Sequence, residues 1–173
     1  ISTDDLADLF AFLKSVPAVA GRPPDHELAF PFNLRRGIGL WKWLYLDGAP
    51  FTPSPEHSAL WNRGAYLVNG PGHCAECHSP RSLAGGIIES RRFAGGPSPE
   101  GGAGRVPNIT PHAEGLGRWS VEDIEEFLKT GFTPDFDSAG GSMAEVIKNT
   151  TQLSDDDRKA IATYLKALPP LPK

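Results

Sequence analysis

The pentapeptide Cys-Ala-Glu-Cys-His at residues 74–78 is the feature that most limits how this 173-residue chain can fold. Two cysteines three positions apart, followed directly by a histidine, form the attachment pattern of c-type haem. In that pattern both sulfurs bond to haem vinyl groups and the imidazole binds the iron. We therefore predict one haem c in this chain, attached through Cys74 and Cys77, with His78 as an iron ligand.

Other uses of the two cysteines stay open at this point. A Cys-x-x-Cys pair can be a dithiol of the thioredoxin kind, but that site needs a βαβ context, and no parallel strands are predicted here. A structural zinc site needs four nitrogen or sulfur ligands, and the chain has no third cysteine. A helix that carries the pattern by chance is the remaining alternative.

The composition, 39% hydrophobic and 22% charged, is typical of a globular protein of one domain with an appendage. No run of about 18 apolar residues is present, so we expect no transmembrane segment, and a net charge of −4 argues against nucleic acid as a partner. The chain starts at Ile1 without a signal-like segment, so we expect any secretory signal to lie upstream. Covalent haem indicates the bacterial periplasm or the outer face of the inner membrane.

An internal repeat relates residues 1–19 to residues 153–171 without a gap. Both copies predict a helix with a serine N-cap, acidic residues in the first turn and a proline after the end. Chance similarity is the alternative, but we favour duplication, in which residues 1–17 are the closing helix of a preceding haem domain that is otherwise absent. The identical pairs are Ser2 and Ser154, Asp4 and Asp156, Asp5 and Asp157, Leu13 and Leu165, Lys14 and Lys166, and Pro17 and Pro169.

Four helices are predicted in the haem domain, which we assign to residues 55–173. Each prediction rests on a capping residue followed by apolar residues spaced by three and four. The predicted helices begin at Pro55 after Ser54, at Ser120 with Asp123 as a capping box, at Ser142 with Glu145, and at Ser154; they end near Asn69, Gly131, Asn149 and Leu168.

This order of elements, with a lone methionine before the last helix, resembles the class I cytochrome c fold over residues 55–170. The resemblance implies an all-α domain of few helices around the haem, with an irregular N-terminal extension. It also implies a close crossing of the first and last helices, where Gly64 lets Tyr164 approach.

A closer resemblance is to the multi-haem cytochrome subunits of bacterial membrane-associated dehydrogenases that oxidise alcohols, aldehydes or sugar acids. It is carried by Arg-Gly-Ala-Tyr-Leu-Val-Asn-Gly-Pro-Gly-His at 63–73, Pro-Asn-Ile-Thr-Pro at 107–111, Gly-Leu-Gly-Arg-Trp-Ser at 115–120, and the stretch 143–164. It implies electron transfer from a partner dehydrogenase to a quinone or an oxidase. A haem enzyme with an open or substituted distal site, peroxidase-like or sulfur-oxidising, is the alternative, and whether the chain is itself an enzyme stays open.

Met143 is the predicted second iron ligand, because a single-haem electron carrier usually has a thioether there and this is the only methionine. With Val146 and Ile147 it also forms an apolar helix face, so ordinary core packing is the alternative. Among the other histidines, His112 is the most credible substitute.

A glycine-rich stretch, residues 79–118, is too long for an ordinary loop unless it wraps a cofactor. The resemblance implies that the Pro107 carbonyl accepts a hydrogen bond from the iron-binding imidazole. Trp119 and Arg105, together with Arg118, are candidates to contact the haem propionates. A solvent-exposed position is the alternative for the arginines.

Residues 18–54 form a linker rich in proline and aromatic residues, with a short helix predicted from Leu34 to Leu46. Its aromatic side chains could pack on the haem domain or on the preceding one, or form a docking face for a dehydrogenase or a membrane surface. We also expect the apolar stripe of residues 1–17 to fold back on Trp41 or Trp43.

Overall fold

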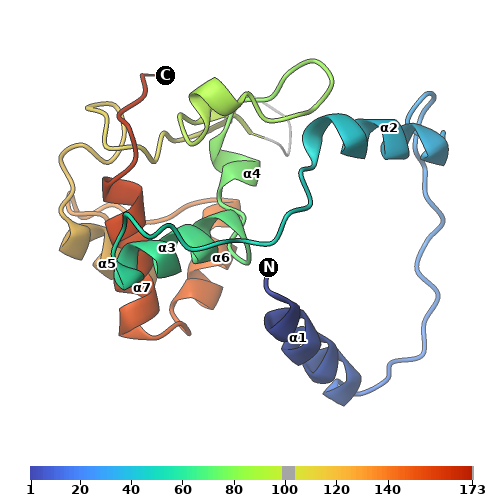
Figure 1. The fold of residues 1–173 in the computed structure, drawn as a ribbon, viewed down its shortest axis with the longest axis horizontal. Coiled ribbons are helices and arrows are strands. Elements are labelled where there is room, and N and C mark those ends of the chain that lie inside the picture. The colour runs from blue at the N-terminus through green and yellow to red at the C-terminus, as the bar shows by residue number, and fades with distance from the viewer. Residues whose placement is uncertain (99–103, 173) are drawn as a thin grey trace. The chain divides into compact units, whose positions relative to one another are not determined.

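The computed structural model describes residues 1–98 and 104–172, and the chain divides into two compact units, Ile1–Phe51 and Thr52–Lys173. Helices are the main regular elements of both units (Figure 1). The strands in the described part are two residues long. The all-α class predicted from the sequence is confirmed. None of the helices in this described part is long and apolar enough to cross a membrane.

The first unit contains two helices, α1 (Thr3–Ser15) and α2 (Arg35–Tyr45). Ser2 caps α1 as predicted, because its side chain accepts a hydrogen bond from the Asp5 amide at 3.0 Å. No residue of either helix is buried, and Trp43 is 78% exposed. Trp41 is less exposed, at 38%. The folding of the α1 stripe onto Trp41 or Trp43 stays a prediction.

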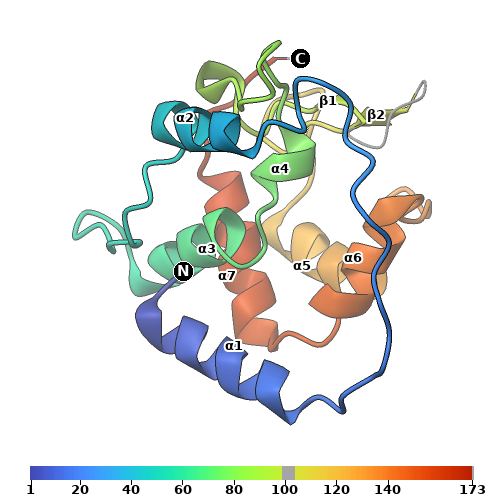
Figure 2. The same cartoon turned by 90° about the vertical axis from the view of Figure 1, so that its right-hand side faces the viewer.

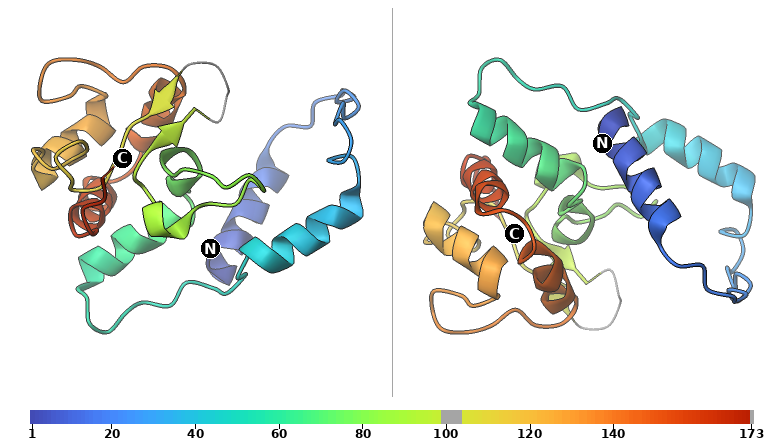
Figure 3. Two further views of the ribbon diagram at one scale, coloured as in Figure 1. Left: turned by 90° about the horizontal axis from the view of Figure 1, so that it is seen from above. Right: turned by 90° about the horizontal axis from the view of Figure 1, so that it is seen from below.

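The second unit holds the remaining elements. They are α3 (Ala59–Asn69), α4 (Ala75–His78), the 3-10 helix Glu89–Arg91, β1 (Gly96–Pro97), β2 (Arg105–Val106), α5 (Val121–Thr130), α6 (Ser142–Thr150) and α7 (Asp155–Lys166). The two strands pair antiparallel, with Gly96 opposite Val106 (Figure 3). The predicted sequence of helices within this unit is thus present, with α4 added at the haem motif.

The start of α3 differs from the prediction, because the helix begins at Ala59 and is capped by Ser58. The buried Asn62 side chain accepts a hydrogen bond from the Ser54 amide at 2.7 Å and donates to the Ser54 and His57 carbonyls at 2.9 and 3.2 Å. These bonds hold residues 54–57 in a turn, so Pro55 does not lie in the first helical position.

The close crossing of α3 and α7 is confirmed, and both helices are visible at the centre of the second unit in Figure 2. A Cβ atom added to Gly64 would lie 2.0 Å from the Ala160 carbonyl oxygen and 2.7 Å from the Tyr164 Cβ. Only glycine allows this approach. Arg63 of α3 forms a bidentate ion pair with Asp157 of α7, at 2.7 and 3.0 Å.

Helix α5 has the predicted capping box, in which Ser120 and Asp123 bond each other's backbone, and it ends at Gly131 in the left-handed region. For α6 the N-cap is Gly141 rather than Ser142, so the predicted serine cap is not present at that position. The C-terminal end of α6 is held by the Thr150 hydroxyl, which donates to the Leu128 carbonyl of α5 at 2.6 Å.

Candidate functional site

The Cys-x-x-Cys-His motif lies on α4, which a tight turn connects to the end of α3. The Gly72 amide donates to the Leu67 carbonyl at 2.8 Å, and the Cys74 amide donates to the Val68 carbonyl at 3.1 Å. Val68 is fully buried and Ala75 is 2% exposed, so both ends of the turn are anchored in the core. The packing of α3 therefore fixes where the motif starts.

Neither cysteine is in a disulfide; Cys77 is exposed and Cys74 is partly accessible. Burial raises the pKa of the Cys74 thiol to about 11, so this sulfur is protonated at neutral pH. The pair is available for two thioether bonds from one short helix. The βαβ context required for a thioredoxin-like dithiol is not found in the described residues.

The His78 ring forms the hydrogen bond that the resemblance implied, with 2.9 Å between Nδ1 and the Pro107 carbonyl oxygen. A carbonyl can only accept, so Nδ1 carries the proton and Nε2 keeps its lone pair for a metal. Burial lowers the pKa of His78 more than this bond raises it, which favours the neutral, ligating form of the imidazole. The three motif residues therefore have the chemistry that haem c requires.

The Pro107 carbonyl is held in place by a buried polar network in the Asn-Ile-Thr sequence that follows it. Asn108 and Thr110 are 2% and 1% exposed, and the Asn108 side-chain oxygen accepts hydrogen bonds from the Thr110 amide and hydroxyl, each at 2.8 Å. The Asn108 amide group also donates to the Leu171 carbonyl at 2.7 Å. The C-terminal segment thus fixes the partner of His78, and hydrogen bonds behind a metal-binding imidazole commonly hold the ring in orientation in this way.

Gly95 supports the same carbonyl from the other side. Its φ is +76°, and an added Cβ would lie 2.6 Å from the Val106 carbonyl oxygen and 2.8 Å from both the Asn108 nitrogen and the Pro107 carbonyl carbon. Its amide donates to the His78 carbonyl at 2.8 Å. The backbone at the end of α4 and the segment around Pro107 therefore approach each other at a glycine.

Met143 lies in the first turn of α6 and is only partly buried. In the apolar face proposed as the alternative, Ile147 is buried at 8% exposure, whereas Val146 is 45% exposed. Ile147 therefore attaches α6 to the core, and Met143 is not among its buried side chains. The role of Met143 as an iron ligand stays a prediction.

The remaining candidates lie in different settings. Trp119 makes an edge-to-face contact with Phe127 of α5, with 5.4 Å between ring centroids. Arg105 lies on β2 and is exposed. His112, the substitute ligand, has its Nδ1 engaged as the acceptor of the Glu114 amide at 3.2 Å. Contacts of Trp119 and Arg105 with haem propionates stay predictions.

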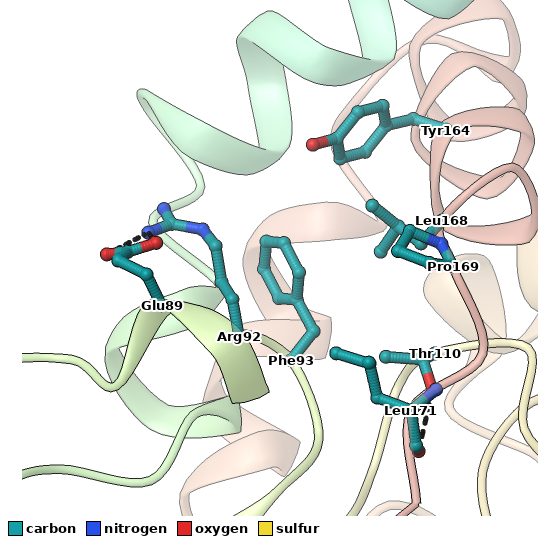
Figure 4. Close-up of a pocket in the computed structure, with 8 residues that line it drawn as sticks. All are labelled: Glu89, Arg92, Phe93, Thr110, Tyr164, Leu168, Pro169 and Leu171. Atoms are coloured by element: carbon teal, nitrogen blue, oxygen red, sulfur yellow. Dashed lines mark hydrogen bonds and ion pairs between the residues drawn. The ribbon is translucent and has the colours of Figure 1, made fainter.

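In Figure 4, a hollow lies between the end of α7 and the segment around Phe93. Arg92 on its rim bonds the carboxylate of Glu89 at 3.0 and 3.1 Å and the side-chain oxygen of Asn69 at 3.2 Å. The Asn69 amide group in turn donates to the Tyr164 hydroxyl at 2.9 Å. These bonds brace the α3 and α7 crossing, so we assign this hollow a structural role.

The sequence did not single out Asn108, Thr110 or Gly95 as supports of the site. The paired glycines at 95 and 96 and the Asn-x-Thr pattern after Pro107 were the available signals. The described residues contain no group of three or more His, Cys, Asp or Glu side chains arranged to hold a metal ion, so the structure adds no further zinc ligand to Cys74 and Cys77 within this part of the chain.

These features fit a domain that holds haem c, the cofactor of the c-type cytochromes. Residues 62–169 match the cytochrome c family, and the chain belongs to that family. It is 50% identical over 169 residues to a diheme cytochrome c-type protein of Cereibacter sphaeroides, covering 98% of this chain and 55% of the relative.

Two other relatives are cytochrome subunits. The chain is 38% identical over 173 residues to the fructose dehydrogenase cytochrome subunit of Gluconobacter japonicus, covering 98% of the chain and 35% of that protein. It is 38% identical over 184 residues to the cytochrome c subunit of the quinone alcohol dehydrogenase of Gluconobacter oxydans, and this match covers 100% of the chain and 38% of that protein. The suspected resemblance is confirmed, and the haem enzyme alternative finds no support. The chain spans between about a third and about half the length of these relatives.

Proposed function

We propose that this chain transfers electrons through one haem c, bound by Cys74, Cys77 and His78 and capped by Met143. The observation that carries the proposal is the bond from His78 Nδ1 to the Pro107 carbonyl at 2.9 Å, which leaves Nε2 for the iron. When bound, haem supplies an iron that alternates between the ferric and ferrous states. The protein's part is to hold the imidazole neutral and in a fixed orientation.

The proposed role of Met143 rests on its position and partial burial. A thioether ligand raises the reduction potential and keeps small molecules from the metal. Arg158 supports the end of the same helix, because its 4% exposed side chain donates to the Thr150 and Thr151 carbonyls, each at 3.1 Å. The helix that carries the methionine is therefore fixed at its far end.

The proposal is tested on protein that has been expressed in a bacterial periplasm, where haem is attached. The measurements are the number of haems, the reduction potential of the iron and the binding of external ligands to it. We expect one haem by mass and pyridine haemochrome, and a reduced-minus-oxidised spectrum with the methionine-to-iron band. Met143→Ala should keep the haem, lower the potential and admit cyanide or carbon monoxide, while the control Val146→Ala should change none of these. Unchanged cyanide resistance in Met143→Ala would transfer the role to another residue, with His112 tested next.

We also propose that the donor is a periplasmic or membrane-associated dehydrogenase and that the acceptor is a quinone or an oxidase. The support is the match to relatives named as dehydrogenase cytochrome subunits. The same match and covalent haem attachment support the further proposal that the protein lies in the periplasm or on the outer face of the inner membrane. Copurification of an affinity-tagged whole gene product with a dehydrogenase activity tests this; a tagged protein isolated without any dehydrogenase would contradict it.

The duplication proposal is that α1 closes a preceding haem domain. It is supported by the repeat of the α7 pattern, by the exposed stripe of α1, and by relatives of greater length. The whole gene product should then carry more than one haem, counted by mass and pyridine haemochrome. One haem in the complete protein would leave α1 as an ordinary N-terminal extension.

Peripheral membrane association is proposed for α2. One side of this helix carries Trp41, Tyr45 and other exposed apolar side chains, while Arg35 and Lys42 supply positive charge. Such helices bind anionic lipid surfaces. The parent protein should therefore float with anionic vesicles, and this binding should be lost in Trp41→Ala and at high salt. Equal flotation with neutral vesicles would contradict a role for charge attraction between α2 and the lipid.

A further inference from the structure

A hollow between α5 and the turn that follows it combines aromatic and acidic side chains. Its lining includes Asp123, Glu126, Phe132, Thr133, Pro134 and Phe136. None of the lining residues of this site, which we call the α5 hollow, belongs to the hydrogen-bond network around His78 described above. The turn leads directly into α6, which carries Met143.

The two aromatic rings of the α5 hollow are displayed to solvent. Phe132 is 62% exposed and Phe136 is 96% exposed, and Phe136 has a φ of +63°, where phenylalanine is rare. Left-handed backbone of this kind costs roughly 1 to 2 kcal/mol in a residue with a Cβ. Phe136 therefore combines an exposed apolar ring with a backbone conformation that is unfavourable for phenylalanine.

The turn itself is well bonded rather than an open loop. The Thr133 amide donates to the Asp137 carbonyl at 2.8 Å, and the Asp137 amide donates to the Thr133 hydroxyl at 3.1 Å. The Ala139 amide closes the turn on the Gly131 carbonyl at 2.8 Å. These bonds therefore hold the backbone from which the Phe136 side chain projects.

The charge around the α5 hollow is strongly negative. The acidic residues of α5 and the turn are Glu122, Asp123, Glu125, Glu126, Asp135 and Asp137. Lys129 is the one basic residue of this stretch, and its amino group lies 3.5 Å from the Asp155 carboxylate. A partner for this surface must therefore bring positive charge.

We propose that the α5 hollow is the docking site for a basic surface of the electron-exchange partner protein, with a lysine or arginine side chain entering between Phe136 and Glu126. An aromatic face and a carboxylate both stabilise a bound cation, and the rings supply apolar contact area. A membrane is disfavoured as the occupant, because bacterial lipid surfaces are themselves anionic. The proposal rests on the proposed electron-transfer function.

The test uses the haem-loaded chain and a lysine-rich mitochondrial-type cytochrome c as a cationic redox probe, with hexacyanoferrate as an anionic one. Glu126→Gln combined with Asp135→Asn should lower the bimolecular rate constant with the cationic probe roughly 3- to 10-fold at low salt. The difference should disappear at high salt, where surface charges are screened. The matched control Asp156→Asn removes an exposed carboxylate elsewhere and should have a much smaller effect.

Phe136→Gly isolates the aromatic ring, because glycine adopts the left-handed backbone without strain and the variant should be at least as stable as the parent. We expect a several-fold lower rate with the cationic probe and an unchanged reduction potential. Leu83→Gly removes another fully exposed apolar side chain and is the control.

Two results would overturn the docking site. Equal rates in the variants and controls would mean that the α5 hollow does not take part in binding. A shifted potential or altered haem spectrum in Phe136→Gly would mean that the ring covers haem. Oxidation by hexacyanoferrate reports separately on the haem, so failure of docking is distinguishable from failure of the proposed electron-transfer function.

Discussion

Replacing Gly64 with alanine sets two effects of opposite sign against each other. Within an exposed helix, glycine to alanine stabilises by about 1 kcal/mol, because alanine is the better helix former. At the α3 and α7 crossing, however, the new methyl group would lie 2.0 Å from the Ala160 carbonyl oxygen and 2.7 Å from the Tyr164 Cβ. Real Cβ atoms do not approach backbone so closely, so one helix has to move.

The size of the loss follows from what that movement breaks. Ala160 and Ala162 are completely buried and Tyr164 is 8% exposed, so α7 cannot shift without opening the core against α3. Overpacking in a well-packed core costs roughly 1 to 3 kcal/mol, and a clash with backbone belongs at the upper end. After subtracting the helix-propensity gain, we expect Gly64→Ala to lower the free energy of unfolding by about 2 kcal/mol.

Guanidinium unfolding of the haem-loaded protein, followed by circular dichroism and by the Soret band, measures this difference. Gly39→Ala in α2 is the matched control, since nothing lies within 4 Å of its added Cβ and helix propensity should act alone. The control should leave the free energy of unfolding of the haem domain unchanged or raise it slightly. A Gly64→Ala protein as stable as its parent would refute the crossing geometry.

Three further predictions follow from the site and the crossing. Cys74→Ala should leave largely unfolded protein, measured by far-ultraviolet circular dichroism, because the glycine-rich loop cannot supply a core without haem; a compact apo form would refute this. Gly95→Ala should displace the Pro107 carbonyl, weaken its bond to the imidazole and raise the reduction potential, read by redox titration. Arg63 holds the pKa of Asp157 below its usual value, so this pair stabilises the fold at neutral pH and is lost as pH falls through that lowered pKa; Asp157→Asn should cost up to about 1 kcal/mol at pH 7, since the pair is partly solvent-screened, and the difference from the parent should shrink steadily in acid, read from unfolding curves at several pH values.

The helices and the local chemistry of the haem motif could be predicted because they depend on residues close in sequence. The capping box at Ser120, the glycine end of α5 and the glycine at the crossing were all visible as patterns. The start of α3 was wrong, because Asn62 reaches back to bond Ser54. The Asn108 network was missed for a related reason, since its partner, Leu171, is far away in the sequence.

The two repeat helices show what a helix-forming pattern leaves undecided. Leu9 and Leu13 of α1 are aligned with Ile161 and Leu165 of α7, yet the first pair is 47% and 59% exposed and the second is 7% and 5% exposed. Capping, acidic first turn and apolar spacing are alike, so they cannot cause this difference. The helices that bury α7 are α5 and α3, whose glycine admits the α7 backbone. By the same physics, the partner we propose for α1 should be a helix with a small residue at the crossing point, preceding its own Cys-x-x-Cys-His motif.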